Sequence, residues 1–268
     1  MSGSVIHSQS AAMVPAVYSA GQSPQLPVVI DYPAALALRQ MSMVHDELPK
    51  YLLPPEVSAL LHYVPDLRRK MLLATLWNTG ARINEALALT RGDFSLAPPY
   101  PFVQLATLKQ RIEKAARTAG RTPAGQQTHR LVPLSDTWYV SQLQTMVATL
   151  KIPLERRNKR TGRTEKARIW EVTDRTVRTW IGEAVAAAAA DGVTFSVPVT
   201  PHTFRHSYAM HMLYAGIPLK VLQSLMGHKS ISSTEVYTKV FALDVAARHR
   251  VQFAMPESDA VAMLKQLS

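Results

Sequence analysis

The segment that decides the fold and the site is Thr200-Pro201-His202-Thr203-Phe204-Arg205-His206-Ser207, followed along the chain by Met226-Gly227-His228 and by Tyr237. Threonine and proline are typical of the N-cap and first position of a helix, which predicts a helix from Pro201 to Ala215. His202 and Arg205 then share one face of its first turn. A cation beside the positive end of a helix dipole is unfavourable unless an anion binds there as well. The pattern therefore predicts an anion-binding site.

The residues that follow predict two more helices. One runs from Pro218 to Met226, ends at a glycine, and leaves His228 in the turn. The spacing Ser232-x-x-Glu235 is typical of a capping box, which predicts Tyr237 in the first turn of the next helix. A lone tyrosine on an amphipathic helix is usually a half-buried packing residue. A chemical role for Tyr237 is therefore argued from the neighbouring cations and histidines. His206 and His211 are interpreted as structural residues of the helix that begins at Pro201.

Arg82, farther upstream, occupies an equally unfavourable place for a cation. A helix is predicted over residues 67–77, with Gly80 as its C-terminal stop, and a second helix starts at once. Arg82 falls in the first turn of that second helix, and Glu85 is placed to form a salt bridge with it. A surface arginine with a helix-stabilising partner is the simple alternative for either arginine alone. Two such arginines together with a histidine weaken that alternative.

Two segments of strand-forming residues, 101–108 and 129–134, predict a β-hairpin joined by a basic, glycine-containing loop, residues 110–128. Residues 155–168 hold seven Lys or Arg and two Glu. That composition fits a solvated loop and a contact with a DNA backbone equally well. Further helices are predicted to open at Pro54 and to run from Thr173 to Ala190. The predicted fold class is mainly α with a small antiparallel β-hairpin or sheet.

Three regions are expected along the chain. Residues 1–45 are rich in Ser, Ala, Pro and Gln and predict a flexible arm with a short helix. Residues 46–253 form the expected catalytic domain. Residues 254–268 include a short amphipathic stretch, which predicts a helical tail that docks on its own domain or, in trans, on a neighbouring subunit.

Composition favours a nucleic-acid partner. The 268 residues include 30 Lys and Arg against 19 Asp and Glu, a formal charge of +11. Such an excess favours polyanions, because neutralising phosphates releases counterions. The chain has no cysteine, which excludes disulfides, thiolate catalysis and cysteine-rich zinc sites. It also lacks a signal-peptide pattern and an apolar run of about 18 residues. We therefore expect a cytoplasmic protein that binds nucleic acid and has no membrane contact. That the nucleic acid is DNA and the cell bacterial is implied only by the resemblance described next.

Four motifs in this order resemble those of the tyrosine recombinases, the phage integrase family, and in particular those of plasmid resolvases. They are Thr79 to Leu89, His202 to Ser207, Leu225 to His228, and Thr234 to Tyr237. The resemblance covers roughly residues 50–245. It implies the tyrosine-recombinase catalytic domain and an enzyme that cuts and rejoins DNA strands at specific sites. The strands would be held through a 3′-phosphotyrosyl intermediate, without metal or ATP.

The resemblance also implies roles for single residues. Arg82 and Arg205 would bind the non-bridging oxygens of the scissile phosphate, assisted by His228. Tyr237 would attack phosphorus, and His202 would exchange protons with that tyrosine. These roles match the chemistry, because a phenol is a weak nucleophile near neutral pH and a phosphorane-like transition state needs fixed cations.

A lysine in the hairpin would be the general acid for the departing 5′-hydroxyl, which is a poor leaving group. Lys109, at the end of the first predicted strand, matches best, and Lys114 is the alternative. No carboxylate cluster has the spacing of a metal site, so we expect neither a metal nor a cofactor.

The expected partners are double-stranded DNA with a specific site, a homo-tetramer on that DNA, and accessory DNA-bending proteins. Resolution of plasmid multimers or cointegrates is the preferred function. The alternatives are an integrase or invertase of a mobile element with the same chemistry, a topoisomerase without sequence specificity, and a non-catalytic DNA-binding regulator on the same fold. The tyrosine argues against the regulator, because binding alone does not require it.

Overall fold

Helices dominate the computed structural model, which describes residues 39, 49–106, 129–158, 160–228, 230–249, 263 and 265. The helices are α2 (Pro54–His62), α3 (Leu67–Thr79), α4 (Ile83–Leu87), α5 (Thr137–Thr149), α6 (Asp174–Ala190), α7 (Pro201–Tyr214), α8 (Leu219–Met226) and α9 (Ser232–His249), with a 3-10 turn η1 (Arg91–Asp93). A three-stranded sheet has the order β1 (Phe94–Ser95), β2 (Phe102–Ala106), β3 (His129–Pro133), and β4 (Glu155–Arg157) pairs with β5 (Thr164–Lys166). The predicted class, mainly α with small antiparallel sheets, is confirmed.

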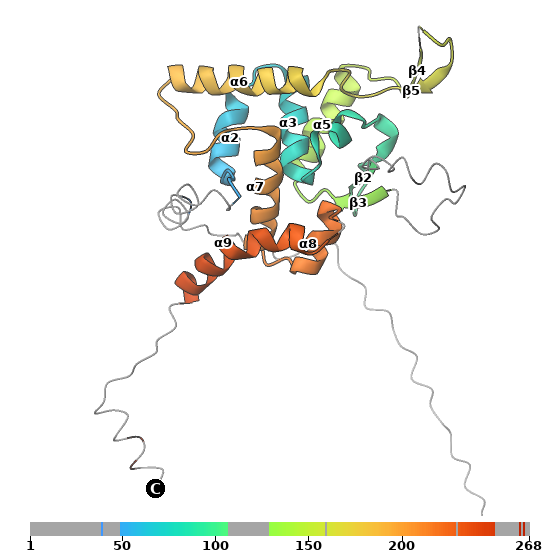
Figure 1. Cartoon of the computed structure of the whole chain (residues 1–268). Helices are drawn as coiled ribbons and strands as arrows, with labels where there is room; N and C mark the ends of the chain where they lie inside the picture. Colours follow the sequence, from blue (N-terminus) through green and yellow to red (C-terminus); the bar gives the residue numbers. More distant parts are fainter. Residues whose placement is uncertain are drawn as a thin grey trace, which may run out of the picture.

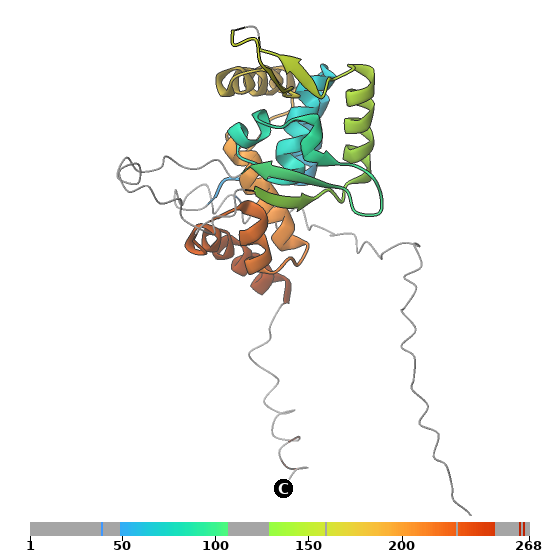
Figure 2. The same ribbon diagram turned by 90° about the vertical axis from the view of Figure 1, so that its right-hand side faces the viewer.

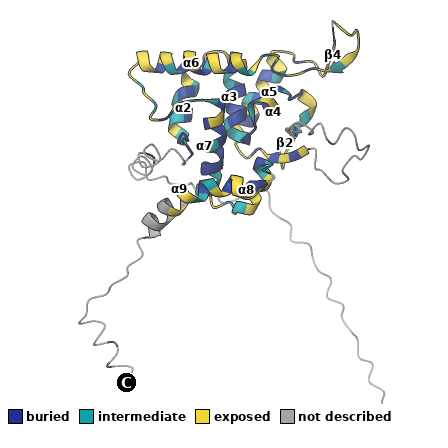
Figure 3. Ribbon diagram, viewed as in Figure 1, coloured by how far each residue is buried: buried dark blue, intermediate teal, exposed yellow. Residues whose placement is uncertain are grey.

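Helix α7 is the buried centre of the molecule. Helix α6 lies across one end, α2, α3, α5 and α7 run beneath it, and α8 and α9 lie at the other end (Figure 1). Helix α7 packs against α3, α8 and α9, and its ribbon is almost entirely buried, whereas the outer face of α6 is exposed (Figure 3). A helix with buried residues on most faces must lie inside the core. Arg205, one of the predicted phosphate-binding residues, therefore projects from the buried centre of the fold.

Helix α3 ends as its sequence predicts, although two residues later than expected. Asp66 caps its start by accepting a hydrogen bond from the amide of Arg69, and Gly80 ends it with φ of 59°. This left-handed conformation suits glycine. Gly80 also has no room for a side chain, because a Cβ would lie 2.3 Å from a ring carbon of Tyr208 in α7. The glycine thus lets α3 and α7 approach closely beside the site.

The predicted start of α9 is wrong by a fraction of a turn. Ser232 was expected to cap the helix, but it is the first helical residue. The amide of Glu235 donates to the carbonyl of Ile231, so the helix begins one residue earlier than a cap at Ser232 would allow. Tyr237 lies in the second turn and not in the first, and it is 2% exposed.

The predicted hairpin is confirmed over the described residues: β2 and β3 pair antiparallel, with Val103 opposite Val132 and Leu105 opposite Arg130. Strand β1 adds to the other edge of β2 (Figure 2). Strand β1, helix α5 and the β4–β5 hairpin were not predicted. The basic stretch 155–168, expected as a solvated loop or a DNA contact, contains that hairpin, in which Arg156 forms an ion pair with Glu165 at 2.8 Å.

Several predicted features lie outside the described residues. These are most of the N-terminal arm and of the 254–268 tail, together with the loop that holds Lys109 and Lys114. Arg39 of the arm is described and is 1% exposed. Its guanidinium forms a bidentate ion pair with Glu56 of α2 and donates to Ser196 and to the carbonyl of Tyr51. In the described part of the chain, no helix is long and apolar enough to span a membrane.

Replacing Gly80 with alanine should lower the free energy of unfolding by about 2–4 kcal/mol, from the left-handed backbone and the clash with Tyr208 together. Urea denaturation monitored by circular dichroism measures it. Gly192 is the matched control, because its φ is 80° and nothing lies within 4 Å of the position that a methyl group would occupy. Gly192→Ala should cost only about 1–2 kcal/mol. Equal costs for the two substitutions would contradict the close approach of α3 and α7.

Candidate active site

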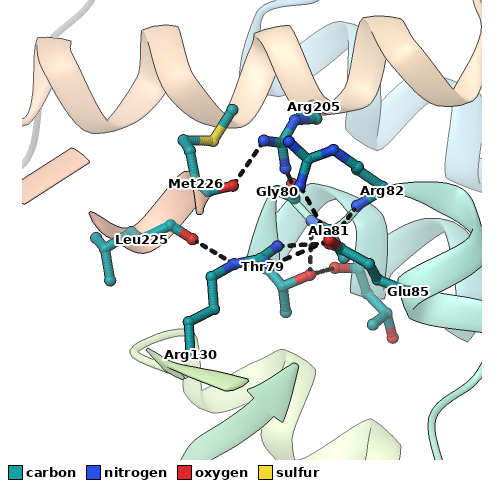
Figure 4. A network of polar contacts seen from close by, with 10 residues as sticks. Thr79, Gly80, Ala81, Arg82, Glu85, Arg130, Arg205, Leu225 and Met226 are labelled. Carbon is teal, nitrogen blue, oxygen red and sulfur yellow. Dashed lines mark hydrogen bonds and ion pairs between the residues drawn. The ribbon is translucent and has the colours of Figure 1, made fainter. Parts of the chain in front are cut away.

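The carboxylate of Glu85, in α4, is buried at the centre of a network of arginines (Figure 4). Its Oε2 accepts a hydrogen bond from the backbone amide of Arg82 at 3.0 Å, and this bond caps the start of α4. Its Oε1 accepts a hydrogen bond from the Arg82 guanidinium, also at 3.0 Å. The expected salt bridge between these residues is present. Arg130 donates to both oxygens of the same carboxylate, at 3.1 and 2.6 Å. One carboxylate therefore fixes two arginines from different elements.

Arg130 comes from strand β3 and was not singled out from the sequence. Its side chain is 4% exposed and lies on the inward face of the strand with Val132. Its Nε donates to the carbonyl of Leu225 in the last turn of α8, at 2.8 Å. The period of two along a strand is the signal that finds it, because Arg130 and Val132 must share a face. A charged residue at an inward position requires partners, and here they are Glu85 and the end of α8.

Arg205 projects from α7 and is 3% exposed. It donates to the carbonyl of Gly80, at the end of α3, at 2.5 Å and to the carbonyl of Met226, at the end of α8, at 2.6 Å. Both carbonyls lie at C-terminal helix ends, where the dipole is negative. Burial, and then the charges of Arg82 and Arg130, lower the pKa of Arg205 to about 10. The guanidinium is therefore still charged at neutral pH.

The cluster carries more positive than negative charge. The guanidiniums of Arg82, Arg130 and Arg205 surround Glu85, which leaves two positive charges uncompensated within the described part of the chain. Burial alone raises the pKa of Glu85, but the hydrogen bond and charge of Arg130, and then Arg82, outweigh it, so that the pKa lies below its usual value. Glu85 is thus ionised at neutral pH, and the excess of cations makes an anion the missing partner.

His228 lies beside this cluster, in the turn after α8. Its Nδ1 is 2.9 Å from the hydroxyl of Thr234 in α9. Burial, followed by the charges of Arg205 and Arg82, lowers its pKa to about 4. At neutral pH the ring is neutral, and within the described part of the chain no hydrogen bond occupies its Nε2.

Tyr237 of α9 is the predicted nucleophile, and its hydroxyl lies 3.0 Å from Nδ1 of His206. The resemblance assigned the proton exchange to His202, but within the described structure the hydroxyl contacts His206, which was interpreted as structural. His202 is exposed, and its ring lies edge-on to that of His206, with centroids 4.7 Å apart. Burial raises the pKa of Tyr237 to about 12, although Arg205 and Arg82 act in the opposite direction. The phenol is therefore protonated in the free protein.

The structure brings together five of the six predicted site residues, namely Arg82, His202, Arg205, His228 and Tyr237, which interact through hydrogen bonds, ring contacts or charge. Lys109 lies outside the described residues. Among the residues described, no group of three or more histidines and carboxylates is placed to hold a metal ion. The arrangement can bind an anion between fixed cations and present a phenol to it.

Comparisons with known proteins agree with this geometry. The model of the phage integrase family matches residues 50–243. A protein named resolvase, from Escherichia coli strain K12, is 95% identical over 268 residues, which is the whole of both chains. Tyrosine recombinase XerD of Mycobacterium leprae is 33% identical over 202 residues, covering 72% of this chain and 57% of its own.

Solved structures share the fold. XerA recombinase matches with a TM-score of 0.53 and 20% identity, over 77% of this chain and 67% of its own. XerH recombinase, solved as a post-cleavage complex with a palindromic difH substrate, matches with a TM-score of 0.53 and 19% identity. The match covers 76% of this chain but only 53% of XerH, so the chain spans about half the length of that recombinase.

Replacing Arg130 with methionine should lower the free energy of unfolding by about 3–5 kcal/mol at pH 7, because it leaves the buried carboxylate of Glu85 without its main partner. The pKa of Glu85 is lowered in the folded protein, so the stability it contributes is present above its ordinary pKa and is lost as the pH falls. The loss in free energy of unfolding caused by Arg130→Met should therefore be smaller at pH 4 than at pH 7. Urea denaturation at both values measures it.

Arg156→Met is the control, because the ion pair of Arg156 with Glu165 is about one-third exposed. Its removal should cost at most about 1 kcal/mol. If Arg130→Met costs no more than Arg156→Met, the buried network does not stabilise the domain.

Proposed function

This chain belongs to the phage integrase family, and we propose that it is a site-specific DNA recombinase that resolves plasmid multimers or cointegrates. The observation that carries the proposal is the convergence of Arg82, Arg205 and His228 beside the hydroxyl of Tyr237. The names of its relatives, a resolvase and several tyrosine recombinases, support the same reaction class. The proposed place of action is the DNA of a bacterial cytoplasm.

Arg82 and Arg205 bind the two non-bridging oxygens of the scissile phosphate. Among the described residues, Arg205 makes two bonds to helix-end carbonyls, which leaves three of its five N–H groups for a ligand. The Arg82 side chain is 38% exposed. His228 donates from its other ring nitrogen. The phosphate supplies the negative charge that the cluster lacks, and the same contacts stabilise the added charge of the transition state.

Tyr237 attacks phosphorus, and the 5′-oxygen leaves with a proton from a general acid, for which Lys109 is the proposed residue. The product is a 3′-phosphotyrosyl link, which keeps the energy of the broken phosphodiester. A 5′-hydroxyl from another strand then reverses the reaction, so that joining needs no ATP. The proposed assembly is a homo-tetramer on two DNA sites with accessory DNA-bending proteins.

Alternative functions make different predictions. An integrase or an invertase shares the chemistry and differs in the arrangement of its DNA sites, whereas a regulator on the same fold binds DNA without cutting it. A structure of XerH was solved with DNA after cleavage. That finding concerns XerH, so cleavage by this chain is tested directly. Formation of a covalent adduct separates recombination from regulation for this chain.

The protein should form a covalent adduct with a nicked duplex that carries the DNA segment it protects from nuclease. A nick placed next to the cleavage point lets the short 5′-hydroxyl fragment diffuse away and traps the adduct. Gel electrophoresis in detergent should show the adduct for the wild type and none for Tyr237→Phe. An adduct with Tyr237→Phe, or no adduct with the wild type, would falsify the proposed mechanism.

Arg82→Ala should slow adduct formation about 10²–10³-fold, by analogy with the loss of one oxyanion donor. The partly exposed side chain makes this substitution tolerable for folding, and circular dichroism checks that. Single-turnover rates under saturating protein measure the effect. Arg157→Ala, on the exposed β4–β5 hairpin, is the control and should leave the rate unchanged within about twofold.

A further inference from the structure

The hydroxyl of Tyr237 has one hydrogen-bond partner among the described residues, and it is the ring of His206. Nδ1 of His206 lies 3.0 Å from the phenolic oxygen, and the two rings meet edge to face with centroids 5.6 Å apart. His206 lies on α7 directly after Arg205, in the most buried helix, whereas Tyr237 comes from α9. This contact therefore joins the proposed nucleophile to the helix that carries the phosphate-binding arginine.

We propose that His206 is a further catalytic residue, the general base that takes the proton of Tyr237 during attack and returns it during religation. The inference rests on the proposed function. As the bond from Tyr237 Oη to phosphorus forms and the bond from phosphorus to the 5′-oxygen breaks, the phenolic proton moves to Nδ1 of His206. The 5′-oxygen takes its proton from the general acid. Religation reverses each step, so that the phenol leaves with the proton that His206 held.

Other residues near the phenol are less well placed for this proton. Nδ1 of His228 is occupied by the hydroxyl of Thr234. His202 is exposed and contacts His206 rather than the tyrosine. Arg205 has no lone pair to accept a proton. A general base must lie within about 2.6–3.2 Å of the proton donor, and His206 meets that condition.

The surroundings of His206 keep its ring neutral before DNA binds, and they also make it a weak base until a phosphodiester is bound beside it. Burial, then the charges of His202 and Arg205, lower its pKa to about 4. The groups that face it are His202 and Arg205 of α7, Tyr237 of α9, and His228 after α8. Nδ1 is the acceptor when the imidazole carries its proton on Nε2. A phosphodiester bound at Arg205 adds negative charge, which favours the imidazolium that forms during attack.

Rates of adduct formation on the nicked duplex test the proposal. His206→Ala and His206→Asn should both slow adduct formation about a hundredfold or more. Asparagine places an amide oxygen near Nδ1, so it keeps the hydrogen bond to Tyr237 but cannot take the proton. His211→Asn, on the same helix but packed against Trp77, is the matched control and should react within about twofold of the wild-type rate.

A substrate whose leaving group is better than the phenol of Tyr237 tests the proton transfer by His206 separately from the other steps. A strand ending in a 3′-(p-nitrophenyl phosphate) is annealed next to a 5′-hydroxyl strand, and the protein carries Tyr237→Phe. Attack by the 5′-oxygen then releases p-nitrophenolate, which needs no proton from His206. Adding His206→Ala should leave this joining rate within about twofold, whereas adding Arg82→Ala should slow it about a hundredfold.

The outcomes test the role of His206 and the proposed function separately. Slow adduct formation with both His206 variants, together with unchanged joining of the activated strand, supports His206 as the base. Full recovery by His206→Asn would make the residue only a positioning group, and loss of activated joining would make it part of the phosphate site. Either result overturns the inference while recombination stands. Absence of any adduct with the wild type overturns the proposed function itself.

Discussion

The buried carboxylate of Glu85 is the contact on which the rest of the site depends. It binds the amide of Arg82 to start α4, holds the Arg82 side chain, and anchors Arg130 of β3. Arg130 in turn holds the last turn of α8 through the carbonyl of Leu225. Elements far apart in the sequence are thus joined through one negative charge. Without the carboxylate of Glu85, Arg82 and Arg130 would have no common partner. Strand β3 and helices α4 and α8 would then not be joined through these two arginines.

The ends of two helices complete this arrangement. Carbonyls at the C-terminal ends of α3 and α8 hold Arg205 where a second carboxylate would otherwise be needed. Such carbonyls carry only partial negative charge, so they orient the guanidinium without neutralising it. Gly80 and Gly227 end these helices in left-handed conformations and leave space for Tyr208 and Arg130. The arrangement keeps the cations both fixed and uncompensated, which is what binding a phosphate requires.

Local patterns predicted most of the fold and much of the site. The start of α7 at Pro201, the end of α3 at Gly80 and the pairing of β2 with β3 all follow from capping, turn and alternation rules. Tertiary placement was not predictable in the same way. His206 was interpreted as structural because its partner, Tyr237, belongs to another helix, and the contact between them depends on how α7 and α9 pack. Arg130 was overlooked although the strand period placed it inward, since a lone basic residue in a strand usually faces solvent.

Because Arg39 is buried, the folded domain includes a residue that lies before the segment matching the family. The family match begins at residue 50, yet Arg39 fills a site between Glu56 of α2 and Ser196 before α7. Glu56 also caps α2 through the amide of Leu53, so its orientation bears on the first helix of the domain. A fragment cut where homology starts would keep every proposed catalytic residue and still lose part of its cooperative folding unit. Residues outside the family match therefore take part in the fold of this domain.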